Sequence, residues 1–221
     1  MSARTGVVVA IDGPSGSGKS SASRGVATRL GLRYLDTGAM YRAMTWWMLR
    51  HDVPVRDPAA VAERCHEPDI RSGTDPVHPT ITVDGMDVAA AIRTPEVTGA
   101  VSPVSTVPQV RARLLELQRE VIDGGGIVVE GRDIGSVVAP DADVKVYLTA
   151  EVAARAARRS AEEGGTDLAV TESSLLARDR IDSTRTASPL TMAEGAVHVD
   201  STPYTLEEVV ELIVGLVDAA G

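Results

Sequence analysis

Gly13-Pro14-Ser15-Gly16-Ser17-Gly18-Lys19-Ser20 follows directly after the apolar run Val7-Val8-Val9-Ala10-Ile11. A β-branched run followed by G-x-x-x-x-G-K-S predicts a strand, a phosphate-binding loop (P-loop) and a helix. Backbone N–H groups of the loop and the N-terminus of the helix would hold the anion, with Lys19 on the β- and γ-phosphates and the Ser20 hydroxyl on Mg²⁺. At this composition the pattern arises by chance about two times in a thousand, so a flexible Gly/Ser linker is the weaker alternative.

Composition limits the class of protein and its partners. The chain has 221 residues, 43% hydrophobic and 24% charged, which is typical of one globular domain or one domain with insertions. The net charge of −9 argues against an extended nucleic-acid surface. Of the 22 basic residues all except Lys19 and Lys145 are arginines, so any anion site beyond the P-loop must be built from arginine.

The termini and the single cysteine predict a cytoplasmic protein. Cys65 cannot form an intrachain disulfide, and Asp12 interrupts the only apolar run near the N-terminus. No apolar run approaches the roughly 20 residues that a membrane span needs, so we expect no membrane partner. The four histidines and Cys65 lack zinc-ligand spacing and are expected to be structural.

Five short apolar segments alternate with amphipathic ones, and this order predicts a doubly wound parallel α/β sheet with helices on both faces. The expected strands cover 7–11, 32–35, 127–130, 145–148 and 196–200. The expected helices cover 20–30, 41–50, 108–123, a segment from about 151, a segment capped by Thr171, and 206–217. Trp46 and Trp47 are expected to pack in the core or at an interface.

Residues 56–100 differ in character from the rest because prolines divide them into short segments. Residues 80–83 alternate with period two and lead into Asp84-Gly85, the preferred pair for a tight hairpin turn, before Met86. We therefore predict a small, mostly antiparallel insertion between core segments 1–55 and 101–221.

Charged side chains follow the expected strands at their carboxyl ends, where ligands bind in such sheets. Asp36 and Glu130 could hold Mg²⁺ directly or through water, although Glu130 could instead be a capping or buried paired carboxylate. We expect a group of arginines to surround one cleft and to neutralise more than one phosphate group: Arg42, Arg111, Arg132, Arg178, Arg180 and Arg185. No catalytic base is conspicuous, and a phosphate acceptor would need none because its second pKa is about 6.

Four ordered motifs together resemble bacterial cytidylate kinases. They are Ile11 to Ser20, Tyr34-Leu35-Asp36-Thr37-Gly38-Ala39-Met40-Tyr41-Arg42, Glu130-Gly131-Arg132-Asp133-Ile134-Gly135, and Arg178 to Arg185 with Ser188-Pro189-Leu190. The resemblance extends from about Val7 to Val217 and includes the insertion, which that family uses to bind the monophosphate. Thr37 stands where serine is common in the family, and it keeps the hydroxyl.

The resemblance implies transfer of the ATP γ-phosphate to CMP or dCMP with Mg²⁺, in pyrimidine nucleotide metabolism. We expect the chain to be a monomer. The lid that it implies spans about 155–171. Residues implied to bind ATP are Gly13, Pro14, Ser15, Gly16, Ser17, Gly18, Lys19, Ser20, Ser21 and Arg158. Residues implied to bind CMP are Arg42, Arg132 and Thr37 at the phosphate, Ser102, Arg111 and Asp133 at the base, Tyr41, Arg178 and Asp182 at the sugar, and Arg185 between both phosphates. The implied catalytic residues are Lys19, Arg132, Arg178 and Arg185, and the metal would meet Ser20, Glu130 and Asp36.

Simpler explanations and rival functions remain. Arg155, Arg158 and Arg159 could form i,i+4 pairs with Glu151, Glu162 and Glu163 on a solvated helix. Another P-loop small-molecule kinase, of UMP or shikimate type, is the nearest rival. A GTP-dependent switch would need an Asn-Lys-x-Asp motif, and the sequence contains no asparagine.

Overall fold

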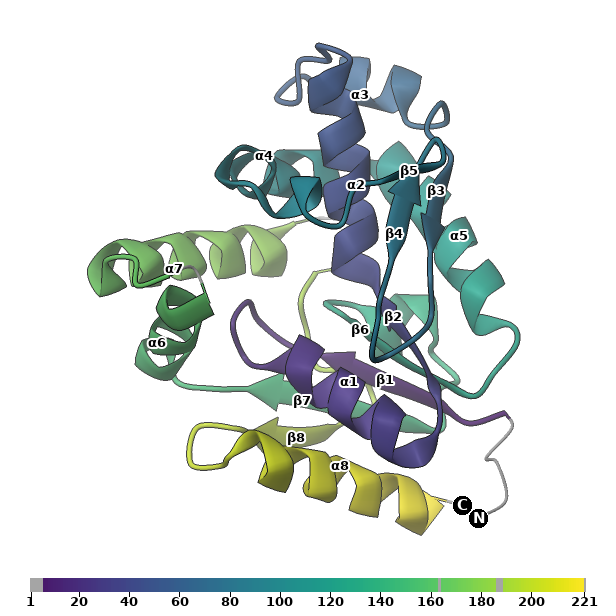
Figure 1. Ribbon diagram of the computed structural model, residues 1–221, viewed down its shortest axis with the longest axis vertical. Coiled ribbons are helices and arrows are strands. Elements are labelled where there is room, and N and C mark those ends of the chain that lie inside the picture. The colour runs from purple at the N-terminus through teal and green to yellow at the C-terminus, as the bar shows by residue number, and fades with distance from the viewer. Residues whose placement is uncertain (1–5, 163, 186–188, 221) are drawn as a thin grey trace.

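The computed structural model describes residues 6–162, 164–185 and 189–220, which form a three-layer α/β structure with a smaller β-containing unit above it (Figure 1). The elements are, in order, β1 (Val8–Asp12), α1 (Lys19–Leu30), β2 (Arg33–Asp36), α2 (Thr37–Arg50), α3 (Pro58–Arg64), β3 (Ile70–Ser72), β4 (Ile81–Val83), β5 (Met86–Asp87), the 3-10 helix η1 (Ala91–Arg93), α4 (Pro95–Ser105), α5 (Pro108–Ile122), β6 (Ile127–Gly131), the π-helical turn η2 (Ile134–Val138), β7 (Val144–Thr149), α6 (Val152–Glu162), α7 (Leu168–Thr184), β8 (Val197–Asp200) and α8 (Leu206–Ala220).

The main sheet has five parallel strands in the order β2-β6-β1-β7-β8. Strand β1 is central, and β6 separates it from β2, which follows it in the sequence. Helices α1 and α8 cover one face, while α2 and α5 lie on the other (Figure 1). The predicted doubly wound parallel sheet is therefore confirmed. In the part of the chain that the structure describes, no helix is long and apolar enough to cross a bilayer.

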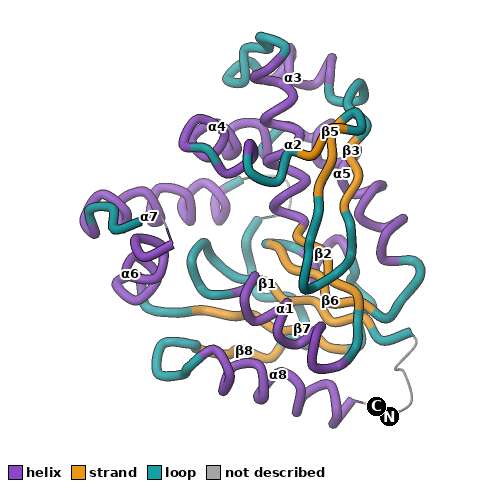
Figure 2. The backbone as a smooth tube through the Cα atoms, viewed as in Figure 1, coloured by secondary structure: helices purple, strands orange, loops and turns teal. Residues whose placement is uncertain are grey.

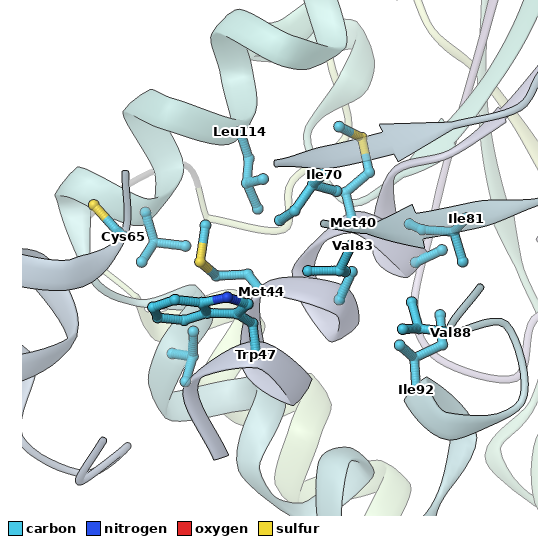
Figure 3. Close-up of a cluster of buried hydrophobic side chains, with 14 of the residues drawn as sticks. Met40, Met44, Trp47, Cys65, Ile70, Ile81, Val83, Val88, Ile92 and Leu114 are labelled. Carbon is cyan, nitrogen blue, oxygen red and sulfur yellow. The ribbon is translucent and has the colours of Figure 1, made fainter. Parts of the chain in front are cut away.

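Each face of the sheet has its own apolar core. Strand side chains such as Ile11 pack with α1 and α8, and those such as Val129 pack with α2 and α5. The core that includes Val129 extends into the insertion, and Figure 3 shows Met44 and Trp47 of α2 beside insertion residues such as Val83. Trp47 is buried, as its predicted packing role requires. The insertion thus shares a core with one face of the sheet.

The insertion contains the predicted hairpin and more helix than the sequence indicated. Strands β3, β4 and β5 form a three-stranded antiparallel sheet, and Asp84 and Gly85 both adopt the positive φ angles of a tight turn. The connection between β3 and β4 reaches down to β2, where Thr74 O accepts a hydrogen bond from Tyr34 N at 2.9 Å (Figure 2). Helices α3 and α4 were not predicted, and α4 crosses the expected boundary at residue 100.

Two expected helix starts were wrong. Helix α2 begins at Thr37 rather than Tyr41, because the Asp36 carboxylate accepts a hydrogen bond from Ala39 N and caps the first turn. Helix α7 begins at Leu168, where Asp167 is the N-cap, and Thr171 lies inside the helix with its hydroxyl bonded to Asp167 O. In both cases an aspartate one turn earlier takes the capping position.

Candidate active site

The loop between β1 and α1 has the geometry of an anion-binding site. A Cβ on Gly13 would lie 2.0 Å from the carbonyl oxygen of Leu148, so only glycine lets the loop pass this close to β7. Gly18 takes a left-handed conformation at the N-cap of α1, and no side chain caps this helix. The amides of the first helical turn, which begins at Lys19, are therefore not capped by a side chain and can bind a phosphate.

Lys19 lies across this loop and is buried. Its Nζ donates to the carbonyl oxygen of Pro14 at 2.7 Å. Burial, assisted by the charge of Arg132, lowers the pKa of Lys19 to about 7. A bound polyphosphate would reverse this effect, because its negative charge favours the ammonium form.

Glu130, at the end of β6, is the buried carboxylate beside the loop. It accepts hydrogen bonds from the Ser20 hydroxyl at 3.0 Å and from the Tyr34 hydroxyl, and its carbonyl oxygen accepts one from Thr37 Oγ1 at 2.7 Å. Burial, with a contribution from the charge of Asp36, raises the pKa of Glu130. Tyr34 was missed by the sequence analysis, since nothing in the sequence shows that β2 lies beside β6.

Asp36 lies next to Glu130 in the parallel register of β2 and β6, but both of its oxygens have partners. One accepts from Ala39 N at 2.8 Å and the other pairs with Arg42 Nη2 at 2.9 Å. Among the described residues, no three His, Cys, Asp or Glu side chains gather as a metal-ligand cluster. Ser20 and Glu130 are thus the closely placed oxygen donors of the expected metal set.

Asp12 is a further buried carboxylate that the sequence analysis did not assign to the site. Its two oxygens accept hydrogen bonds from Ile134 N and Gly135 N, each at 2.8 Å. Burial raises the pKa of Asp12 to about 6 despite these bonds. The contacts tie the end of β1 to the turn that follows Asp133, and so fix the P-loop relative to the base-binding residues expected there.

A second charged cluster lies beside the P-loop and is built around Asp133. Arg111 Nη2 pairs with this carboxylate at 2.5 Å and Arg185 Nη2 approaches it at 3.5 Å, with all three side chains buried. The Arg111 guanidinium lies 5.4 Å from the ring centroid of Tyr41, whose pKa burial raises to about 12. A cavity of about 120 Å³ adjoins Tyr41, Arg111 and Asp133 and is also lined by Gln118. The structure thus brings together three of the residues expected at the base and sugar.

Helix α7 supplies the other charges of this cluster from one of its faces. Arg132 Nε donates to Asp182 at 2.8 Å, and Arg185 lies 3.8 Å from the same carboxylate. Arg178 donates to Thr98 O of α4 at 2.6 Å. Because Arg178, Asp182 and Arg185 are spaced i, i+4 and i+7, they share one side of the helix. Burial and the neighbouring Arg111 lower the pKa of Arg185.

Three expected residues are placed differently from this cluster or are not described. Arg180 is exposed, on a different face of α7 from Arg178, so its predicted place among the cleft arginines is wrong. Ser102 is half-buried on α4, and among the described contacts its hydroxyl makes no hydrogen bond to Arg111 or Asp133. Ser188, part of the fourth motif, lies outside the described residues.

The alternative in which Arg155 pairs with Glu151 on a solvated helix is wrong. Arg155 is buried and donates instead to the carboxylate of Asp179 at 2.6 Å and to the P-loop carbonyl of Ser15 at 3.0 Å. Because α6 packs against the P-loop, the Arg155 guanidinium is removed from water and needs buried hydrogen-bond acceptors, which Asp179 and Ser15 O provide. Arg155 and Asp179 are therefore P-loop contacts that sequence reasoning missed.

Arg158, one turn further along α6, also contacts the P-loop. It donates to Ser17 O at 3.4 Å, to Ser201 Oγ at 3.0 Å and to Ser201 O at 2.9 Å. The expected partners of Arg158 and Arg159, Glu162 and Glu163, have no described side chains. Arg158 thus lies at the edge of the loop where its phosphate role was expected.

A five-stranded parallel sheet with a glycine-rich loop and a buried lysine at the end of its central strand defines a P-loop nucleotide-binding protein. The family model for cytidylate kinase matches residues 9–219. The chain belongs to the cytidylate kinase family, as the four motifs predicted.

Individual relatives agree with this membership. A cytidylate kinase of Streptomyces avermitilis is 58% identical over 214 residues, which cover 96% of this chain and 93% of that protein. A cytidylate kinase of Mycobacterium leprae is 48% identical over 218 residues, with 96% of each chain covered. A solved structure of an uncharacterized protein from Eubacterium ventriosum is similar with a TM-score of 0.54 at 10% identity, covering 96% of this chain and 98% of that one, which supports the fold alone.

Proposed function

We propose that this chain transfers the γ-phosphate of ATP to CMP or dCMP, giving CDP or dCDP. Membership of the cytidylate kinase family supports the reaction. The observation that carries the choice of acceptor is the buried Arg111–Asp133 pair, which lies beside the P-loop and adjoins a cavity.

The chemistry of the base explains why a buried carboxylate would favour cytosine. Cytosine carries an exocyclic amine, a hydrogen-bond donor, where uracil carries a carbonyl acceptor. An acceptor-only carboxylate such as Asp133 pairs with the amine and repels the carbonyl, and burial makes the mismatch costly. We propose that Arg111 holds Asp133 in place and that both face the base.

The remaining charges are proposed to hold the two phosphate groups for transfer. An oxygen of the CMP phosphate attacks the γ-phosphorus, a new P–O bond forms, the bond to the β–γ bridging oxygen breaks, and ADP leaves. Lys19 would stabilise the donor phosphates, while Arg132, Arg178 and Arg185 would offset charge on the transferred group and the acceptor. The acceptor phosphate is mostly deprotonated at neutral pH, so no catalytic base is needed.

Magnesium is proposed as the metal of this reaction. The Ser20 hydroxyl and the Glu130 carboxylate lie 3.0 Å apart at the start of α1, and both are the oxygen ligands that Mg²⁺ prefers. Few protein ligands are needed, since this ion keeps several waters and binds substrate phosphates. The ion would neutralise charge on the triphosphate. Asp36, with both oxygens engaged, is proposed to act through water.

We further propose a cytoplasmic monomer that acts in pyrimidine nucleotide metabolism, on the basis of the family. The test of the reaction is ADP formation from ATP and Mg²⁺ over a panel of nucleoside monophosphates and shikimate. CMP and dCMP should give the fastest turnover. Fastest turnover with UMP, AMP or shikimate would overturn the assignment of the acceptor. Sedimentation of the purified chain tests the monomer.

A further inference from the structure

One acidic side chain of α7 occupies a position that the expected reaction does not explain. The carboxylate of Asp179 extends to the P-loop, where Oδ1 accepts a hydrogen bond from Ser15 N at 3.3 Å. Its other oxygen, Oδ2, accepts one from Arg155 Nη1 at 2.6 Å. The same Arg155 nitrogen donates to Ser15 O at 3.0 Å. Asp179 and Arg155 together thus hold both the N–H and the C=O of one P-loop residue.

The Asp179 carboxylate lies where the P-loop would bind an anion. Backbone N–H groups of a P-loop serve to bind phosphate oxygens, and Asp179 places a carboxylate oxygen on one of them. Its charge also acts on Lys19, whose pKa it raises against the larger effect of burial. A triphosphate in the loop would meet this negative charge at close range, and the two anions would compete for the same donors.

The same helix carries residues of the acceptor side. Asp182 pairs with Arg132, and Arg185 approaches both Asp182 and Asp133. A contact that holds α7 on the P-loop therefore also fixes the position of these groups. A ligand that breaks the Asp179 contact would remove this link between α7 and the P-loop, while Arg178 and Asp182 keep their contacts with α4 and Arg132.

We propose that Asp179 is a positioning residue that binds the P-loop as an internal anion and is exchanged for a phosphate oxygen of the donor, so that donor binding releases α7 from the P-loop and changes the affinity for the acceptor. The inference rests on the proposed function in taking ATP as donor and CMP as acceptor. The exchange itself requires only a polyphosphate in the loop.

Calorimetric binding of inorganic triphosphate is the first test, because it needs no phosphoryl transfer. Asp179→Asn keeps the size of the side chain and removes its charge, and should bind triphosphate about tenfold more tightly than the wild type. Asp179→Glu, which keeps the charge, should remain within about twofold of the wild type. Equal or weaker binding by Asp179→Asn would overturn the proposal, and Asp179→Ala provides a second neutral variant.

A matched control separates the contact from general charge. Glu172→Gln removes the same charge from α7 seven residues earlier, on the same face, and the described contacts include none between this side chain and the P-loop. Its affinity for triphosphate should stay within about twofold of the wild type. A gain equal to that of Asp179→Asn would show that net charge alone is responsible, and would overturn the specific role.

The second test measures coupling between the two sites. In the wild type, a non-hydrolysable ATP analogue should change the dissociation constant of CMP, and by linkage CMP should change that of the analogue by the same factor. In Asp179→Ala, which removes both acceptor oxygens, this factor should fall to about one, because the contact that links α7 to the P-loop is lost. The coupling would be refuted if the ATP analogue did not change the dissociation constant of CMP in the wild type, or if it changed this constant equally in the variant. If CMP does not bind at all, the proposed function fails while the triphosphate test still stands.

Discussion

Replacement of Lys19 by methionine should stabilise the chain in the absence of nucleotide, although it should abolish ATP binding. The Lys19 ammonium is buried, and the drop of its pKa from 10.5 to about 7 corresponds to at most ~5 kcal/mol of unfavourable free energy below pH 7. The variant also leaves the Pro14 carbonyl without its 2.7 Å donor, a loss of about 1–3 kcal/mol. Lys19→Met should therefore raise the free energy of unfolding by about 2 kcal/mol at pH 7.

The lowered pKa of Lys19 also predicts how the free energy of unfolding changes with pH. Between pH 7 and 10.5 the unfolded chain binds a proton at Lys19 that the folded chain has lost, so wild-type stability rises with pH in this window. Urea unfolding of the nucleotide-free protein from pH 6 to 9 should show the advantage of Lys19→Met shrinking as the pH rises. Lys145→Met, a change at the other lysine, is the matched control. It should leave the wild-type dependence of the free energy of unfolding on pH unchanged. The reasoning would be refuted if Lys19→Met were less stable than the wild type and its free energy of unfolding changed with pH as in the wild type.

Three further substitutions test the geometry around the loop. Gly131→Ala would place a Cβ 2.7 Å from Thr37 Oγ1 and should lower the free energy of unfolding by about 1–3 kcal/mol in urea titrations. An unchanged free energy of unfolding would show that neighbouring atoms move to accommodate the methyl group. Glu130→Gln should raise the Mg²⁺ concentration needed for half-maximal activity, and an unchanged Mg²⁺ requirement would remove Glu130 from the metal site. Because burial raises the pKa of this carboxyl, the same variant should have a higher melting temperature at pH 7. Gly13→Ala, which forces a Cβ to 2.0 Å from Leu148 O, should lose calorimetric ATP binding, and normal binding would contradict the observed loop path.

Local patterns were sufficient for much of the fold. The P-loop and the hairpin turn at Asp84-Gly85 both depend on residues adjacent in the sequence, and both appear as predicted. The expected strands all occur, and the central strands β1 and β6 are the buried, nearly continuous apolar runs that are typical of a parallel sheet. Helix starts were less predictable, since several aspartates and threonines compete for each cap, as at Asp167 and Thr171.

Contacts that depend on strand order and helix docking could not be predicted. The hydrogen bond from Tyr34 to Glu130 exists because β6 is inserted between β1 and β2, an order that no local pattern specifies. The pairing of Arg155 with Asp179 rather than Glu151 follows from the docking of α6 and α7 on the P-loop. The local i,i+4 rule contributes only about 0.2–0.5 kcal/mol and is easily overridden by a buried partner.

The ratio of kcat/KM for CMP to that for UMP, measured in the wild type and in Asp133→Asn, tests cytosine recognition most directly. The wild type should prefer CMP by at least ~100-fold, because its buried carboxylate can only accept hydrogen bonds. An asparagine amide offers a donor as well as an acceptor, so the ratio should fall at least about tenfold while the KM for ATP stays unchanged. The same ratio in both proteins, or a wild type that prefers UMP, would contradict the assignment of Asp133 to the base.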